Sequence, residues 1–254
     1  MSSRRKEGKA FLNLHKRLET AIKDYDMIHP GDHVLVGASG GKDSSILLAL
    51  LAREKVETTN DYKLSAIFVH LGFEGDDEKE AYLKEYAATL NVPFYAVKEP
   101  IHDFWGSSKK KPCYVCSRHR RLVIFKHAKA IGANVIAFGH HRDDFMETYL
   151  LNILYSGCTE TIRPNNPFFG GEFRVIRPML YIDEKALEAE ARRRGIRTFP
   201  SGCPYATSSE RQFVKDLIAE AFRRHRQVRK SLFRAMFTVH SDYLLKPPSR
   251  SSVL

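Results

Sequence analysis

The stretch that decides the fold is Val34-Leu35-Val36-Gly37-Ala38-Ser39-Gly40-Gly41-Lys42-Asp43-Ser44-Ser45-Ile46-Leu47-Leu48, in which an apolar strand turns through small residues into an apolar helix. Glycines in such a turn let the backbone come close to a ligand, and the first amides of a helix attract anions. Lys42 adds a cation at the same point. The stretch therefore predicts a phosphate-binding loop between a strand and a helix.

This loop differs from a Walker A motif, which ends in Gly-Lys-Ser/Thr and carries an earlier glycine five positions before its last one. Here Asp43 follows Lys42, and Val36 occupies the place of the early glycine. The sequence Ser-Gly-Gly-Lys-Asp-Ser instead resembles the pyrophosphate loop (PP-loop) of ATP pyrophosphatases, which cleave ATP between its α and β phosphates to adenylylate a substrate. An ordinary strand-to-helix turn is the alternative, but packing gives no reason for its lysine and flanking serines.

The chain is strongly basic. Its 254 residues are enough to bury a full α/β core, and they carry a formal net charge of +11 with a pI near 9.5. A basic surplus is often only solvated surface, but a concentration of charge in three segments favours an RNA partner. These segments hold Lys109, Lys110, Lys111, Arg118, Arg120, Arg121, Lys126 and Lys129; then Arg192, Arg193, Arg194 and Arg197; and then Arg223, Arg224, Arg226, Arg229 and Lys230.

Membrane insertion and secretion are not indicated. The longest wholly apolar run, residues 46–52, is far too short to cross a bilayer, and the N-terminus lacks the apolar core of a signal peptide. The sequence predicts a soluble cytoplasmic protein with no membrane partner. Because that compartment keeps thiols reduced, the four cysteines are not expected to form structural disulfides.

Strand-like apolar runs alternate with helical patterns along the chain. Expected strands are residues 34–37, 65–70, 94–97, 135–138 and 174–176, and expected helices are residues 11–28, 43–53, 77–90, 117–131, 143–155, 183–194 and 208–222. This alternation is typical of an α/β fold with a doubly wound parallel sheet, closed here by the strand 174–176. Ligands of such folds bind at the carboxyl ends of the strands.

Two cysteines stand where a basic helix is expected to begin, in Cys113-Tyr114-Val115-Cys116. Amide dipoles at a helix start stabilise thiolates and so favour metal binding. Such a pair is also consistent with two buried small hydrophobes, a redox dithiol or half of a zinc site. Cys203, in a loop rich in glycine and proline, is the third candidate ligand. No second C-x-x-C follows, so a closed four-cysteine zinc site cannot be built from local motifs.

Taken together, the motifs closely resemble those of the tRNA 2-thiocytidine synthetase family of PP-loop enzymes. The resemblance spans residues from about 20 to 240. Its matching residues are Ala38 to Ser44, Cys113-x-x-Cys116-Ser117-Arg118-x-Arg120-Arg121, Gly139-His140-His141-Arg142-Asp143-Asp144, Ile176-Arg177-Pro178, and the Cys203 loop followed by Arg211-Gln212. It implies an adenine-nucleotide α-hydrolase-like fold with added terminal helices.

The resemblance also implies a 4Fe-4S cluster held by three thiolates, with one iron open for a sulfur species. The ligands carried over are Cys113, Cys116 and Cys203, whereas Cys158 has no counterpart and is expected to be a structural or incidental thiol. The chain lacks the paired zinc motifs of many 2-thiouridine relatives, which favours the 2-thiocytidine branch. Expected partners are tRNA and a cysteine desulfurase or other sulfide donor, and a homodimer is left open.

The implied reaction adenylylates C2 of a pyrimidine in tRNA, cytidine by preference, and replaces its oxygen with sulfur. Catalytic roles are expected for Lys42, Asp144 and Arg120, although Asp144 could equally cap a helix with Asp143, and Arg120 could contact an RNA phosphate. The expected residues at ATP and magnesium are Ala38, Ser39, Gly40, Gly41, Lys42, Asp43, Ser44, His70 and Gly139.

Four segments are expected: a leading helix in 1–29, a PP-loop ATP pyrophosphatase domain with the C-x-x-C insertion in 30–200, a cluster-ligand loop with basic helices in 201–245, and a disordered tail in 246–254. Competing interpretations are a tRNA 2-thiouridine synthetase, a lysidine-synthetase-like ligase, which uses the same phosphate loop without needing three cysteines, and a catalytically idle RNA-binding protein with a structural metal.

Overall fold

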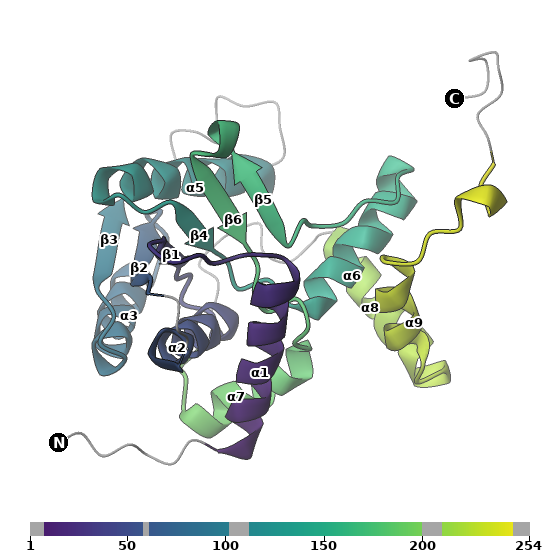
Figure 1. Cartoon of the computed structure of the whole chain (residues 1–254), viewed down its shortest axis with the longest axis horizontal. Coiled ribbons are helices and arrows are strands. Elements are labelled where there is room, and N and C mark those ends of the chain that lie inside the picture. Colours follow the sequence, from purple (N-terminus) through teal and green to yellow (C-terminus); the bar gives the residue numbers. More distant parts are fainter. Residues whose placement is uncertain (1–7, 58–60, 102–111, 200–209, 246–254) are drawn as a thin grey trace. The chain divides into compact units, whose positions relative to one another are not determined.

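A computed structural model describes residues 8–57, 61–101, 112–199 and 210–245 (Figure 1). The chain divides into two compact units. One unit comprises Met1–Phe145 and Ile162–Ser209, and the other comprises Met146–Thr161 and Glu210–Leu254. Cys203 and the tail 246–254 lie outside the described residues.

The first unit is built on a six-stranded sheet with the strand order β3-β2-β1-β4-β6-β5. All neighbouring strands pair in parallel except β5 and β6, which are antiparallel. The strands are β1 (His33–Gly37), β2 (Lys63–His70), β3 (Phe94–Lys98), β4 (Val135–Ala137), β5 (Asn165–Phe168) and β6 (Phe173–Ile176). The predicted α/β fold with a doubly wound, mostly parallel sheet is therefore confirmed.

One strand was not expected from the sequence. We predicted that residues 174–176 would close the sheet, but β5 lies outside β6 and forms the edge. The segment Asn165-Asn166-Pro167-Phe168 shows no alternation of apolar residues, and it contains a proline, which is tolerated in a strand mainly at a sheet edge. Its pairing with β6 therefore depends on tertiary contacts more than on local preference.

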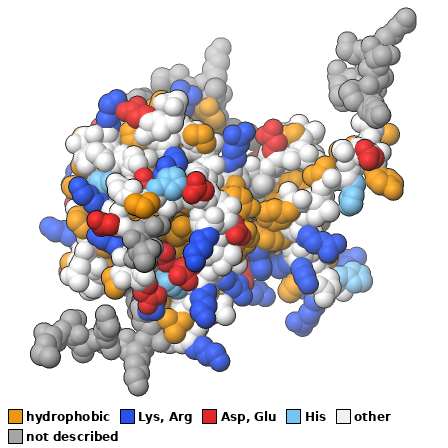
Figure 2. Space-filling model, viewed as in Figure 1, with side chains coloured by type: hydrophobic (Ala, Val, Ile, Leu, Met, Phe, Trp, Pro, Cys, Tyr) orange, Lys and Arg blue, Asp and Glu red, His pale blue; other side chains and the backbone are white. Residues whose placement is uncertain are grey.

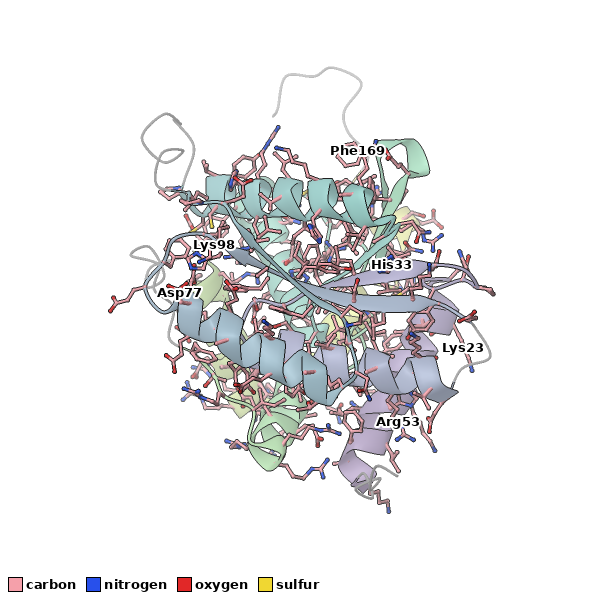
Figure 3. All side chains as sticks on the ribbon, turned by 90° about the vertical axis from the view of Figure 1, so that its left-hand side faces the viewer. Lys23, His33, Arg53, Asp77, Lys98 and Phe169 are labelled. Carbon is pink, nitrogen blue, oxygen red and sulfur yellow. The ribbon has the colours of Figure 1, made fainter. Side chains whose placement is uncertain are left out.

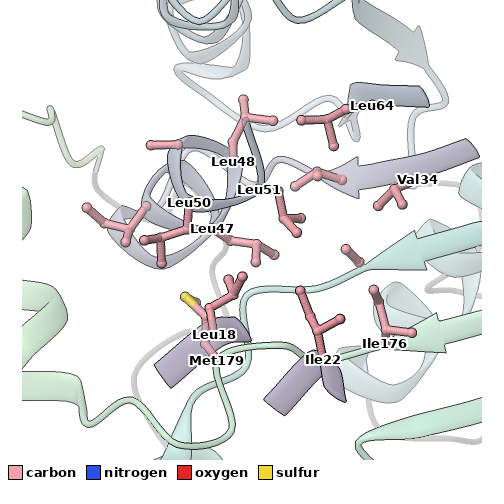
Figure 4. Packing of buried hydrophobic residues seen from close by; sticks show 14 of the residues in the cluster. Leu18, Ile22, Val34, Leu47, Leu48, Leu50, Leu51, Leu64, Ile176 and Met179 are labelled. Atoms are coloured by element: carbon pink, nitrogen blue, oxygen red, sulfur yellow. The ribbon is translucent and has the colours of Figure 1, made fainter. Parts of the chain in front are cut away.

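Helices cover both faces of the sheet. They are α1 (Lys9–Asp24), α2 (Lys42–Glu57), α3 (Asp76–Thr89), α5 (Pro112–Ile131), α6 (Arg142–Leu151) and α7 (Glu184–Arg194). Side chains of α1, α2 and α7 pack with Val34, Val36 and Ile176 in one core cluster (Figure 4). Side chains of α5 pack on the opposite face with Leu35 and Val175, so that α5 and α3 lie on either side of the sheet (Figure 3).

The alternation along each strand explains this division of the core. Successive side chains of a strand point to opposite faces of its sheet. Val36, Ala137 and Ile176 pair in one row across β1, β4 and β6, and all three belong to the cluster beneath α2. The residues one position further along these strands therefore face α5.

A buried ion pair between His15 and Glu54 holds the leading helix α1 against α2. The fully buried His15 places its Nε2 atom 2.8 Å from Oε2 of Glu54, with Glu19 and Glu57 on the side of Nδ1. Burial alone would lower the pKa of His15, but Glu54 and then the other two carboxylates outweigh it and raise the pKa above its ordinary value of 6.5. The helix that starts in the PP-loop is thus anchored at its far end.

We expect stability to fall as the pH rises through the pKa of His15. The folded protein holds this proton more tightly than the unfolded chain, so the stabilisation is complete below about pH 6.5 and is lost above the higher pKa of the folded state. Urea unfolding at pH 6 and pH 8.5 measures the difference in free energy. His15→Gln should flatten that dependence, and an unchanged slope in this variant would assign it to other groups.

The second unit is helical. It contains the end of α6, a π-helical turn at Asn152–Ser156, α8 (Glu210–Arg224) and α9 (Val228–Ala235), and its core includes Met146, Val214 and Ile218. We predicted one helix over residues 143–155, but the α-helix ends at Leu151 and the π-turn ends at Gly157, which adopts a φ of 65°. Basic helices were expected within 201–245, but the sequence pattern gave bounds for only one of them, 208–222, and not for α9. Basic side chains lie over α8 and α9 (Figure 2).

No described helix is both long enough and apolar enough to pass through a bilayer.

Candidate active site

The PP-loop follows β1 at the carboxyl edge of the sheet, and its serines hold it in shape. The backbone N–H of Ser39 donates to Oγ of Ser44 at 3.1 Å, and that hydroxyl donates to the carbonyl oxygen of Gly41 at 3.0 Å. Ser45 makes a similar bond of 3.2 Å to the same carbonyl. Lys42 and Asp43 open α2, so their amides have no acceptor within the helix and remain suited to an anion.

Glycine occupies positions 40 and 41 of the loop for different reasons. Gly40 adopts a φ of +79°, a region that side chains disfavour, so the turn itself requires glycine there. Gly41 has no such φ, and a Cβ on it would meet only the Ser39 hydroxyl at an ordinary 3.4 Å. The fold therefore does not require glycine at position 41, whereas close approach of a ligand would.

We expect Gly41→Ala to keep the stability of the protein and to weaken ATP binding. An added methyl fits the free protein but stands where phosphate oxygens would approach the amides, so a loss of about tenfold in affinity is expected. Urea unfolding and calorimetric titration with ATP measure the two quantities. Gly40→Ala is the contrast, because its strained φ should lower stability as well. Equal losses of stability in both variants would refute the distinction.

Lys42 is held by carboxylates from two elements. Its Nζ atom lies 3.3 Å from Oδ2 of Asp43 and 3.5 Å from Oε1 of Glu184, the first residue of α7. Burial opposes the charge of Lys42, but Asp43 and Glu184 outweigh it and raise its pKa above the usual value. The side chain is therefore a fixed cation beside the loop. Glu184 was missed by sequence reasoning, because nothing near it in the sequence links it to the loop.

Gly139, at the end of β4, brings the following loop against the start of α2. A Cβ on Gly139 would lie 3.0 Å from the carbonyl carbon of Asp43 and 3.0 Å from the amide nitrogen of Ser44. Those contacts are with backbone atoms, which cannot move aside cheaply. The segment Gly139–Asp144 and the PP-loop therefore adjoin at one edge of the sheet, where a single nucleotide could contact both.

The paired aspartates at the start of α6 take different partners. Oδ2 of Asp144 accepts the backbone N–H of His141 at 2.9 Å, which is the helix-capping role that we weighed against catalysis. Oδ2 of the buried Asp143 accepts the backbone N–H of Glu184 at 2.7 Å and so ties α6 to α7. Asp143 thus has a clear structural role, while Asp144 is the more exposed of the two.

Asp43 carries an oxygen suited to a metal ion. Its Oδ1 atom is buried without a hydrogen-bond partner. Burial raises the pKa of this carboxyl, and the nearby Asp144 raises it further, against the lowering effects of His141 and Lys42. A buried carboxylate with an unused oxygen, close to a second carboxylate, suits a hard divalent cation such as Mg²⁺.

His70 ends β2 and is engaged with acidic neighbours. Its Nε2 atom lies 3.2 Å from Asp77, and its Nδ1 atom lies 3.7 Å from Asp76. The carbonyl oxygen of His70 already accepts the backbone N–H of Glu99. The expected contact between this strand end and adenine stays a prediction.

Cys113 and Cys116 stand on the first turns of α5. Cys113 is exposed, and Cys116 is half-buried against the core on the α5 face. Their spacing of three residues places both on one side of the helix, as two thiolates of one cluster require. Arg120 lies one turn further on, and its Nε atom is buried without a hydrogen-bond partner. Cys158 belongs to the second unit. Because Cys203 lies outside the described residues, the full ligand set remains a prediction.

Comparisons with known proteins agree with these features. Residues 12–221 match the PP-loop domain family. The chain is 36% identical to a tRNA-cytidine(32) 2-sulfurtransferase of Syntrophotalea carbinolica, covering 94% of this chain and 93% of that protein. It is 31% identical to the protein of the same name from Pelobacter propionicus, covering 92% and 88%.

Solved structures show the same fold at lower identity. The U34-tRNA thiolase NcsA from Methanococcus maripaludis, with its [4Fe-4S] cluster, superposes with a TM-score of 0.71 at 22% identity, covering 89% of this chain and 78% of that one. The NMN synthetase of Francisella tularensis gives a TM-score of 0.52 at 13% identity, covering 94% and 98%. From the loop, the strand order and these relatives, the chain belongs to the tRNA 2-thiocytidine synthetase family of PP-loop proteins, with an adenine-nucleotide α-hydrolase-like fold.

Proposed function

We propose that this chain is an ATP-dependent tRNA sulfurtransferase that adenylylates C2 of a pyrimidine, cytidine by preference, and replaces its oxygen with sulfur. The observation that carries the proposal is that the PP-loop and the helix of the cysteine pair, α5, adjoin the same edge of the sheet. The PP-loop leaves β1 at the carboxyl edge, and Ile124 of α5 lies beside Gly37 at the same edge. Cys116 is eight residues before Ile124, so it stands about 12 Å further out, beyond the strand ends.

The reaction needs a better leaving group on the base. An oxygen at C2 departs poorly. Its attack on the α phosphorus of ATP breaks the bond to pyrophosphate and leaves C2 bonded to AMP through that oxygen, so that sulfide attacking C2 would displace AMP. Pyrophosphate is released in that first step, and the charge that develops on it is matched by Lys42 and the amides that open α2. Mg²⁺ would be held by Asp43 and Asp144 and would neutralise phosphate charge there.

The cysteines supply the second half of the reaction. When bound to Cys113, Cys116 and Cys203, a 4Fe-4S cluster would present an iron with an open position for a sulfide, delivered by a cysteine desulfurase or another donor. Arg120 lies one helical turn from Cys116 and is suited to orient the activated oxygen or the departing AMP. The names of the relatives favour cytidine in tRNA as the substrate.

Anaerobic turnover with ATP labelled at its α phosphate tests the proposal. Protein reconstituted with iron and sulfide is mixed with unmodified tRNA, and the nucleosides are then identified by mass spectrometry. Labelled AMP that appears only with tRNA, together with 2-thiocytidine, is the expected result. Labelled ADP as the sole product would refute the assignment of the loop, and 2-thiouridine or an amino-acid adduct of cytidine would refute the assignment of the product.

A further inference from the structure

A buried arginine follows β6 without an anionic partner. Arg177 is 8% exposed, and among the described residues no carboxylate forms an ion pair with it. Its guanidinium donates one hydrogen bond, from Nη1 to the carbonyl oxygen of Arg163 at 2.6 Å, and its Nε atom is buried with no partner. Proteins seldom bury a guanidinium without a counter-charge, because desolvation of the charge is costly.

A second positive charge acts on this guanidinium. Burial, and then the charge of Arg121 on α5, lower the pKa of Arg177 to about 10. Arg177 is therefore still protonated at neutral pH. Arg121 itself donates to the carbonyl oxygen of Ser117 at 3.2 Å, which leaves its charge uncompensated by that bond. Arg121 is exposed, whereas Arg177 is buried, and their like charges repel. An anion bound beside Arg177 would relieve that repulsion.

Continuing the alternation of β6 by one residue puts Arg177 on the α5 face. Ile176 packs beneath α2 and Val175 packs beneath α5, so the next residue returns to the α5 face. Phe138, the first residue after β4, packs on that face too, and its backbone N–H donates to the carbonyl oxygen of Ile176 at 3.0 Å. Arg177 thus lies on the face of the sheet that α5, the helix of the cysteine pair, covers.

We expect ATP to bind on the opposite face of the sheet. The amides of the PP-loop open α2, which packs on the opposite face of the sheet. Arg177 is also two strands away from β1, which is about 10 Å at the usual strand spacing. A phosphate that reaches Arg177 would therefore approach from the α5 side, where the substrate base must meet the cysteines. ATP phosphates on the PP-loop would not occupy that position.

We propose that Arg177 forms an anion site that takes a backbone phosphate of the substrate RNA close to the nucleotide being modified. This inference rests on the proposed function. The arginine fork suits phosphate oxygens, and a contact of this kind positions the RNA without reading its sequence. The cost of burying an uncompensated charge is then offset only when RNA is bound, as is common for groups kept for binding rather than for stability.

The test compares RNA and ATP binding by variants at one position. Arg177→Met and Arg177→Gln remove the charge, and Arg177→Lys keeps it but loses the fork. Lys84→Gln is the matched control, since it removes a positive charge from an exposed site on α3, on the other face. Fluorescence anisotropy measures the affinity for unmodified tRNA over a series of salt concentrations. Calorimetry measures the affinity for ATP, and circular dichroism verifies folding.

Both neutral variants should bind tRNA about tenfold more weakly, with the slope of log affinity against log salt reduced by about one. Arg177→Lys should keep the slope of log affinity against log salt. The affinity for ATP should stay unchanged in all three Arg177 variants. A folded neutral variant that binds tRNA with normal affinity and a normal salt dependence would overturn the assignment. Arg177 would then have only a structural role, as a hydrogen-bond donor to the carbonyl oxygen of Arg163. A parallel loss of ATP affinity would assign the phosphate to the nucleotide and would also overturn it.

Failure of this inference can be separated from failure of the proposed function. If the unaltered protein thiolates tRNA and the neutral variants bind tRNA normally, only the role of Arg177 is wrong. If the unaltered protein binds no tRNA, the proposed function falls together with the anion site.

Discussion

Cys113→Ala should yield protein without its iron–sulfur cluster and with no detectable thiolation of tRNA. Iron content is expected to drop from about four atoms per chain to nearly none, because two remaining thiolates cannot hold a cubane cluster securely. Cys113 is exposed, so its truncation should change the free energy of unfolding by no more than about 0.5 kcal/mol. Iron analysis and the visible absorption of anaerobically purified protein measure the effect. Cys116→Ala and Cys203→Ala should lose the cluster and tRNA thiolation in the same way as Cys113→Ala.

Cys158→Ala is the matched control for these variants. Cys158 lies in the second unit and is a free thiol, so the variant should keep both the cluster and activity. Loss of the cluster in Cys158→Ala would show that the ligand set is misassigned. Colourless, active protein with one zinc per chain would contradict the whole iron–sulfur interpretation. Removal of iron with a chelator should abolish thiolation but leave ATP binding in place, because the PP-loop is built from β1 and α2 alone.

Lys42→Ala should lower the rate of AMP formation by about 10²- to 10³-fold. The lysine is a preorganised cation beside the loop, held by Asp43 and Glu184, and its loss leaves those two carboxylates facing the phosphates without compensation. The affinity for ATP should change much less than the rate, because the charge on pyrophosphate grows in the transition state. Single-turnover measurements with labelled ATP separate the two quantities, and the cluster should survive the change.

Two variants sharpen this test. Lys84→Ala removes an exposed lysine on α3 and should leave the rate unchanged. Glu184→Gln keeps the cation but removes one of its partners, so its effect should be smaller than that of Lys42→Ala. A loss of ATP affinity as large as the loss of rate in Lys42→Ala would mean that this side chain only binds the ground state.

The residues of the phosphate loop and of the strands were accessible to sequence reasoning, because their signals are local. A strand, a turn of small residues and an amphipathic or buried helix each depend on neighbours in sequence, and so the fold class could be predicted from residues 34–48 and the alternation that follows. The π-turn after Leu151 and the edge strand Asn165–Phe168 could not be predicted, because both depend on what the segment packs against.

The partners within the site were decided by tertiary structure. Glu184 beside Lys42, the carbonyl and amide of α2 against Gly139, and the charge of Arg121 acting on Arg177 all join segments far apart in the chain. No periodicity or spacing reports such pairs, since they arise where parallel strands end at one edge and helices begin from both faces. The sequence by itself thus determined which chemical groups the protein carries at that edge. Only the packing of the sheet decided which of them are buried, which are paired, and which are left with charge to offer a ligand.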